Sequence, residues 1–83
     1  MPRAYHRGMV AVEYNSHRKE LAGRIKALRI EQGYSIRNFS LMIGISKTHL
    51  ANVESAQASP TFDMLERIAA GLNTKVSDLV TFK

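Results

Sequence analysis

Two short segments on either side of Gly44 constrain the fold most strongly. Each follows a serine, Ser35 in one case and Ser46 in the other. Serine is favoured at the start of a helix because its hydroxyl accepts a hydrogen bond from a free backbone N–H. The glycine between them can adopt the left-handed backbone conformation that a tight turn requires. The pattern therefore predicts two short helices, 36–43 and 47–54, joined by a tight turn.

The chain before this pair divides at about residue 15. Residues 16–32 carry apolar side chains at helical spacing, so Asn15 or Ser16 can cap a first helix that ends at Gly33. Residues 1–15 lack that spacing, and residues 9–14 could form a short extended piece. We expect a basic N-terminal arm over residues 1–15.

The chain after the pair carries signals for two more helices. Thr61 can cap a fourth helix, and Asn73 suits the left-handed residue that follows a helix end. Thr74 can start a short last helix, and no segment is a confident strand. The expected fold is all-α, a compact five-helix domain over residues 16–83.

Size and composition limit the biochemical class. Eighty-three residues without cysteine form one small domain that disulfides or thiolate-bound metal cannot stabilise, so a partner subunit is expected. The three histidines are scattered, and no glycine-rich phosphate loop follows a strand. We expect no catalysis, metal, cofactor or small-molecule ligand. No apolar run is long enough to span a membrane, which favours a cytoplasmic protein.

The positive charge is concentrated in the N-terminal half. Residues 1–47 hold nine Lys or Arg against three Glu, a balance of +6, whereas residues 48–83 hold three against four, a balance of −1. Clustered basic groups suit a polyanionic partner, because they release counterions from its phosphates. A charge excess that only aids solubility is the alternative.

The outer face of the predicted third helix carries short or hydrogen-bonding groups, Lys47, Thr48, His49 and Asn52, opposite the apolar Leu50 and Val53. A helix-turn-helix that binds DNA needs a tight turn between its two helices and a small residue where they cross. Its second helix must also be free to enter the major groove. Helix pairs of this size also occur in proteins that do not bind nucleic acid.

A larger set of residues makes the resemblance specific. Over residues 20–80 the chain resembles the Xre-type helix-turn-helix family, the Cro and phage-repressor class. The resemblance implies a five-helix domain that binds palindromic operator DNA as a homodimer and regulates transcription. The matching residues are Gly23 to Arg29, Gly33 to Ser35, Gly44 to Ser46, Leu50, Val53, Glu54, Pro60, Leu65, Ile68, Ala69, Leu72 and Leu79.

The resemblance places three side chains of the third helix on base edges: Lys47, Thr48 and Asn52. Asn can bond adenine through two contacts and Lys can bond guanine acceptors. The alternative is a solvated helix face.

The resemblance also implies contacts with the DNA backbone. It places Ser46 near a phosphate, in addition to its role as the cap of the third helix. His49 could contact a phosphate or pack against the rest of the protein. We expect Arg37 to replace a phosphate-binding glutamine of the family, because Ile36 stands at the glutamine position here. Ser55 stands where the family tends to place a basic residue or asparagine.

The arm could add further backbone contacts through Arg3 and Arg7, as arms do in several DNA-binding folds. A tail without a role is the alternative. The resemblance further pairs Arg29 with Glu54 in an ion pair between the first and third helices; two separate exposed charges are the alternative there.

The C-terminal end carries more apolar surface than a terminus needs, which predicts a twofold dimer interface at Leu79, Val80 and Phe82. Pairing of two arms through residues 10–14 is the alternative. The function expected is that of a small standalone DNA-binding regulator, of the kind found in phage repressors and controller proteins. The rival is a protein-interaction module of antitoxin or anti-regulator type, favoured by the weak backbone contacts at Ile36 and Ser55.

Overall fold

The computed structural model describes residues 7–82, with side chains from residue 16 onward. This part of the chain forms five helices and no strand: α1 (Arg7–Glu31), α2 (Ile36–Ile43), α3 (Lys47–Glu54), α4 (Phe62–Gly71) and α5 (Val76–Leu79). The all-α prediction and the bounds predicted for the second and third helices are confirmed. No helix in this range is both long and apolar enough to cross a membrane.

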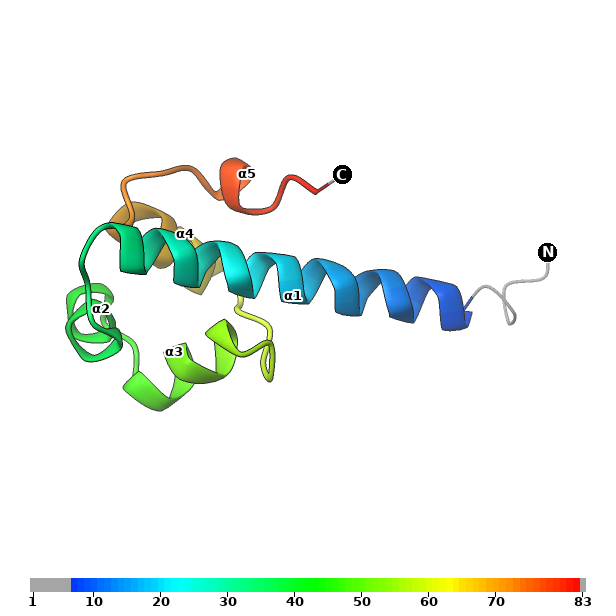
Figure 1. Cartoon of the computed structure of the whole chain (residues 1–83), viewed down its shortest axis with the longest axis horizontal. Coiled ribbons are helices and arrows are strands. Elements are labelled where there is room, and N and C mark those ends of the chain that lie inside the picture. Colours follow the sequence, from blue (N-terminus) through cyan, green and yellow to red (C-terminus); the bar gives the residue numbers. More distant parts are fainter. Residues whose placement is uncertain (1–6, 83) are drawn as a thin grey trace.

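The first helix begins earlier than the sequence suggested. α1 runs without interruption from Arg7 to Glu31, so the predicted cap at Asn15 or Ser16 and the extended piece over 9–14 are wrong. Figure 1 shows that the N-terminal part of α1 extends past the other four helices. A helix that no other element covers needs no apolar stripe, which explains why periodicity did not reveal it. Arg3, assigned to the arm, lies outside the described residues.

Three of the predicted caps are present. The hydroxyl oxygens of Ser35 and Ser46 accept backbone N–H groups three residues later at 3.0 Å, and that of Thr61 does so at 3.2 Å. The last helix differs by one residue, because Lys75 rather than Thr74 occupies its cap position and offers no side-chain hydrogen bond. The starts of α2, α3 and α4 are therefore each fixed by a capping residue in the local sequence.

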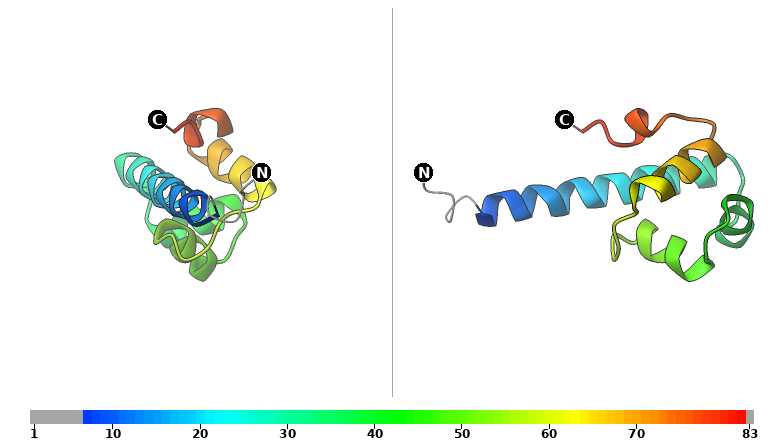
Figure 2. Two further views of the ribbon diagram at one scale, coloured as in Figure 1. Left: turned by 90° about the vertical axis from the view of Figure 1, so that its right-hand side faces the viewer. Right: turned by 180° about the vertical axis from the view of Figure 1, so that it is seen from behind.

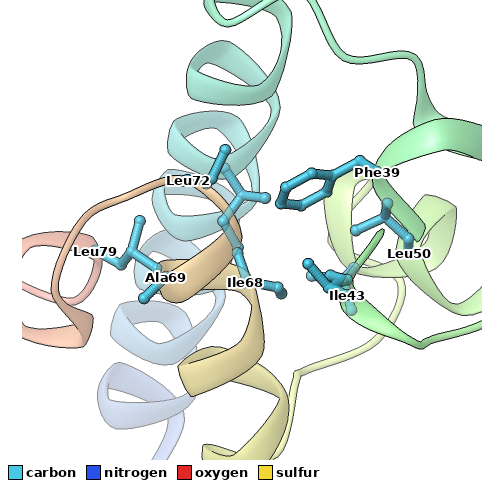
Figure 3. Close-up of a cluster of buried hydrophobic side chains, with 9 residues drawn as sticks. Phe39, Ile43, Leu50, Ile68, Ala69, Leu72 and Leu79 are labelled. Carbon is cyan, nitrogen blue, oxygen red and sulfur yellow. The ribbon is translucent and has the colours of Figure 1, made fainter. Parts of the chain in front are cut away.

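Each helix contributes at least one fully buried side chain to the hydrophobic core, and these include Ile25, Phe39, Leu50, Ile68 and Leu79. Figure 3 shows the side chains of α2, α3 and α4 pointing toward one another in this cluster. Figure 2 shows the short helices gathered around the C-terminal part of α1. Every helix, including the shortest, thus contributes to one core.

A glycine sets the separation of α2 and α4. A Cβ atom added to Gly71 would lie 2.6 Å from Cγ2 of Ile43 and 2.9 Å from Cε1 of Phe39. Those distances are well inside van der Waals contact. Only glycine allows α4 to approach α2 this closely.

The C-terminal segment is attached to α1 through Arg24. Its Nη1 atom donates to the carbonyl oxygens of Asp78, Leu79 and Thr81 at 3.0, 2.8 and 2.9 Å. The Phe82 ring lies 5.5 Å from the Arg24 guanidinium and stacks on His17, with ring centroids 4.6 Å apart. The end of the chain therefore packs on its own first helix.

These contacts correct the predicted dimer surface. Leu79 has no exposed area, so it belongs to the core of its own chain and has no surface for a partner. Phe82 is half-buried against α1, and only Val80 of the predicted trio is exposed. Residues 10–14 are helical, so two arms cannot pair there as strands, and pairing of arms through this segment in any other form stays a prediction.

Candidate nucleic-acid interface

The turn between α2 and α3 has the geometry that the sequence predicted. Gly44 adopts the left-handed conformation, with φ 75° and ψ 35°. Its N–H and that of Ile45 both donate to the carbonyl oxygen of Ser40 at 3.0 Å. Ser40 is buried, and its hydroxyl donates to the carbonyl of Arg37 at 2.8 Å. A small, hydrogen-bonded side chain thus stands at the crossing of the two helices.

The third helix has one buried face and one exposed face. Leu50 and Val53 are buried in the core, whereas the side chains predicted to meet DNA bases are all exposed: Lys47, Thr48 and Asn52. Their positions along α3 bring them to one outward surface, which we call the reading face. The exposure of this face is confirmed, and its contacts with bases stay a prediction.

Three of the side chains predicted to contact the DNA backbone are exposed in the helix-turn-helix. Arg37 is exposed on α2, and His49 is exposed on α3 rather than packed. Ser46 is exposed at the start of α3, where its hydroxyl already accepts the His49 N–H. Arg7 is the first residue of α1, and its side chain lies outside the described set. The roles of these residues in DNA binding remain predictions.

The predicted ion pair between α1 and α3 is present. Arg29 donates through Nε and Nη2 to the two carboxylate oxygens of Glu54, at 2.7 and 2.9 Å, and both side chains are at least nine-tenths buried. Its Nη1 donates to the carbonyl oxygen of Tyr34 at 2.7 Å. The hydrogen bond to Glu54 raises the pKa of Arg29 above its usual value, although burial works in the opposite direction. The end of α3 is therefore held by a charged, bidentate contact.

A groove of about 490 Å³ lies beside this pair, where α1, α2 and α3 meet. Lys26, which is exposed, stands in its lining together with Ile36 and Ser55, the two positions that depart from the family pattern. A basic side chain from α1 thus lies close to positions that lack the expected polar groups. Sequence patterns did not single out Lys26 as a site residue, because neighbouring basic residues on α1 look alike in sequence.

Sequence reasoning also missed Arg67 of α4. Its Nη1 donates to the carbonyl oxygens of Gly44 and Ile43, at 3.2 and 3.4 Å. These carbonyls belong to the end of α2 and to the turn. The contact joins residues far apart in sequence, so no local spacing could have revealed it.

Metal chemistry finds no support in this part of the molecule. Within the described residues, no three His, Cys, Asp or Glu side chains are grouped so that they could hold an ion. The groups gathered near the reading face are instead hydroxyl, amide and cationic ones. They suit the recognition of a polyanion with hydrogen-bonding edges.

Comparisons with known proteins agree with this geometry. The chain is 34% identical over 61 residues to the HTH-type transcriptional regulator SinR of Bacillus licheniformis, covering 72% of this chain and 55% of that protein. It is also 34% identical over 61 residues to the HTH-type transcriptional regulator SutR of Escherichia coli K12, covering 74% and 34%. The chain thus spans about half or less of the length of these relatives.

Solved structures show the same fold. An HTH_3 family transcriptional regulator from Vibrio cholerae aligns with a TM-score of 0.73 at 31% identity, over 78% of this chain and 36% of that one. The clp gene regulator ClgR of Corynebacterium glutamicum aligns with a TM-score of 0.72 at 19% identity, over 76% and 67%. The helix-turn-helix family model matches residues 25–79, from α1 to the end of α5. The chain therefore belongs to the Xre-like helix-turn-helix family.

Proposed function

We propose that this protein binds double-stranded DNA sequence-specifically and regulates transcription, with α3 inserted in the major groove. The observation that carries the proposal is the reading face. Lys47, Thr48 and Asn52 are exposed on one side of a helix whose other side is locked in the core by Leu50 and Val53. Such a helix presents hydrogen-bonding groups in a fixed orientation, which direct reading of base edges requires. The names of the relatives, transcriptional regulators, support the same function.

Phosphate contacts would orient the domain on the duplex. Arg37 is exposed on α2, exposed Lys26 lines the groove beside α3, and Ser46 lies at the start of α3. Backbone contacts of this kind set register and contribute most of the salt dependence of binding. They replace the glutamine at position 36 and the basic residue or asparagine at position 55 that the family leads one to expect.

Binding to a palindromic operator requires a twofold dimer, and we propose that this protein forms one. The buried position of Leu79 moves the proposed surface to the exposed apolar side chains Val80 and Phe62. The two reading helices would then stand about 34 Å apart, one turn of DNA. A change of Val80 to Asp should shift sedimentation from dimer to monomer and weaken operator binding. Sedimentation of the unchanged protein as a monomer at tens of micromolar would refute the dimer.

The decisive experiment is the selection of bound duplexes from a random pool, done in parallel with Asn52→Ala. The unchanged protein should select a consensus with dyad symmetry, and the variant should lose one position in each half-site because Asn52 no longer bonds that base. Asn38→Ala makes the same deletion on the exposed face of α2 and should leave the consensus unchanged.

The same experiment separates the proposal from its rival. A protein-interaction module without a role on DNA would select no consensus and would bind duplexes only weakly at low salt. Regulation at an operator would place the protein in the cytoplasm, where bacterial and phage operators are read.

A further inference from the structure

One arginine contacts the last residue of α3 and another contacts the backbone that precedes α3, and the two contacts differ in kind. At the C-terminal end, Arg29 of α1 binds Glu54, the last residue of the helix. At the N-terminal end, Arg67 of α4 binds the carbonyls of Ile43 and Gly44, which lead directly into Ser46 and the first turn of α3. The second contact has no role in the function proposed above.

We propose that Arg67 is a positioning residue that orients the N-terminal half of α3. The proposal rests on the proposed DNA-binding function and extends it to the way in which base selectivity is divided along α3. Lys47 and Thr48 stand in the first turn of α3, next to the turn that Arg67 holds. Asn52 stands in the last turn, next to Val53 and Glu54.

The contact restrains a part of the backbone that has few other partners. The last carbonyl oxygens of a helix accept no hydrogen bond from N–H groups of the same helix, so their donors must come from elsewhere in the protein. Gly44 and Ile45 share a single acceptor, the carbonyl of Ser40, and the next side chain of the turn, Ile45, is only half-buried. A cation at the C-terminal end of α2 also complements the negative end of the helix dipole. Arg67 therefore restrains the turn from α4.

The close approach of Arg67 depends on the glycine in the turn. A Cβ atom at Gly44 would lie 3.1 Å from the Nη1 atom of Arg67. Glycine is therefore favoured at position 44 for two reasons: the backbone there is left-handed, and a side chain would crowd the Arg67 guanidinium. The turn and the arginine fit each other closely.

The core does not depend on this arginine. Arg67 is exposed, whereas Leu50, Val53 and Ile68 are buried beneath the helices. Loss of its side chain should leave the protein folded and release only the turn. Selectivity at the base pairs facing Lys47 and Thr48 should then fall, while selectivity at the base pair facing Asn52 should persist.

The test compares Arg67→Ala, Arg67→Lys and Lys75→Ala with the unchanged protein. Lys75→Ala, at the cap position of α5, is the control for loss of one positive charge outside α4. The probes are the duplex selected from the random pool and its single-base-pair variants, measured by fluorescence anisotropy well below the unfolding temperature. Arg67→Ala should lose about fivefold or more of its discrimination at the positions facing Lys47 and Thr48, the value of one base contact. Discrimination at the Asn52 position should stay within about twofold.

Arg67→Lys retains a charged donor for the two carbonyls and should recover most of the discrimination. Equal losses at all base positions, or no loss at any, would overturn the proposal. Recovery of affinity without recovery of discrimination in Arg67→Lys would also overturn it, because charge alone would then explain the effect.

A second measurement needs no DNA. Amide hydrogen exchange of Gly44 and Ile45 should become faster by about tenfold or more in Arg67→Ala and remain unchanged in Lys75→Ala, since the turn opens locally without the contact. Unchanged exchange would refute the positioning role. If the unchanged protein selects no consensus while exchange responds as expected, the proposed function fails and Arg67 still positions the turn.

Discussion

Glu54 accepts two parallel hydrogen bonds from Arg29, and the third donor group of the same arginine reaches the carbonyl oxygen of Tyr34. One guanidinium thus connects the end of α1, the loop before α2 and the end of α3. The three elements meet beside the groove that contains Lys26. The pair is therefore an architectural joint next to the reading face.

Removal of one partner from this pair should be costly. Glu54→Ala leaves the guanidinium of Arg29 buried without its carboxylate and should lower the free energy of unfolding by about 3–5 kcal/mol. The exposed pair formed by Arg24 and Glu20, at 2.8 Å, provides the control. Glu20→Ala should cost less than about 1 kcal/mol, because solvent screens that pair. Urea denaturation of both variants checks the difference, and similar losses would contradict the architectural role.

Two glycines should respond to alanine in opposite directions. Gly71→Ala places a methyl group inside contact distance of Ile43 and Phe39, so it should destabilise the fold by about 1–3 kcal/mol. Gly23, in the interior of α1, has no atom within 4 Å of an added Cβ, and Gly23→Ala should stabilise by about 0.5–1 kcal/mol. Thermal unfolding of the two variants tests this contrast. A stabilised Gly71→Ala would show that α2 and α4 can separate easily.

The cap at the start of α3 can be separated from DNA contact by three substitutions at one position. Ser46→Ala removes the acceptor for the His49 N–H and should cost about 1 kcal/mol of stability. Ser46→Asn and Ser46→Asp should both retain the cap and the stability. On DNA the two should differ, because Asp brings a negative charge toward the phosphates and should weaken binding, whereas Asn should not. Equal DNA affinities for Asn and Asp would place Ser46 away from the backbone.

The attachment of the C-terminal segment should depend on Arg24. Arg24→Met removes the donors to the carbonyls of Asp78, Leu79 and Thr81 while keeping the aliphatic part of the side chain. The amide of Val80, which donates to Val76, should then exchange faster with solvent, while amides in the middle of α1 should not change. Hydrogen exchange detected by NMR distinguishes this local opening from global unfolding. Uniform acceleration across the chain would mean that Arg24 supports the whole fold.

The features that the sequence predicted best are those set by residues close to one another along the chain. Ser35, Ser46 and Gly44 act on neighbouring backbone groups, so their roles could be inferred without tertiary information, and the bounds of α2 and α3 followed. Arg29 and Glu54 lie far apart in sequence, and only the family resemblance brought them together. The pattern of capping residues and glycine therefore carries the helix-turn-helix, and the resemblance supplies its main long-range contact.

The failures have physical causes of the same kind. Leu79 looks identical in sequence whether it fills its own core or faces a partner, because both environments favour an apolar side chain. The start of α1 gave no signal, because a helix outside the core has no buried face to mark. Arg67 acts through a tertiary contact with backbone atoms, for which side-chain patterns contain no information.

The length of α1 changes how the N-terminal end of the molecule can act. Twenty-five helical residues rise about 37 Å, slightly more than one turn of DNA. Because α1 is one continuous helix, the direction of its N-terminal part is set by its C-terminal part, which packs in the domain. Each residue inserted into the uncovered part of the helix would rotate everything before it by about 100°. Any contact made by that end would therefore depend on the phase of the helix as well as on its length.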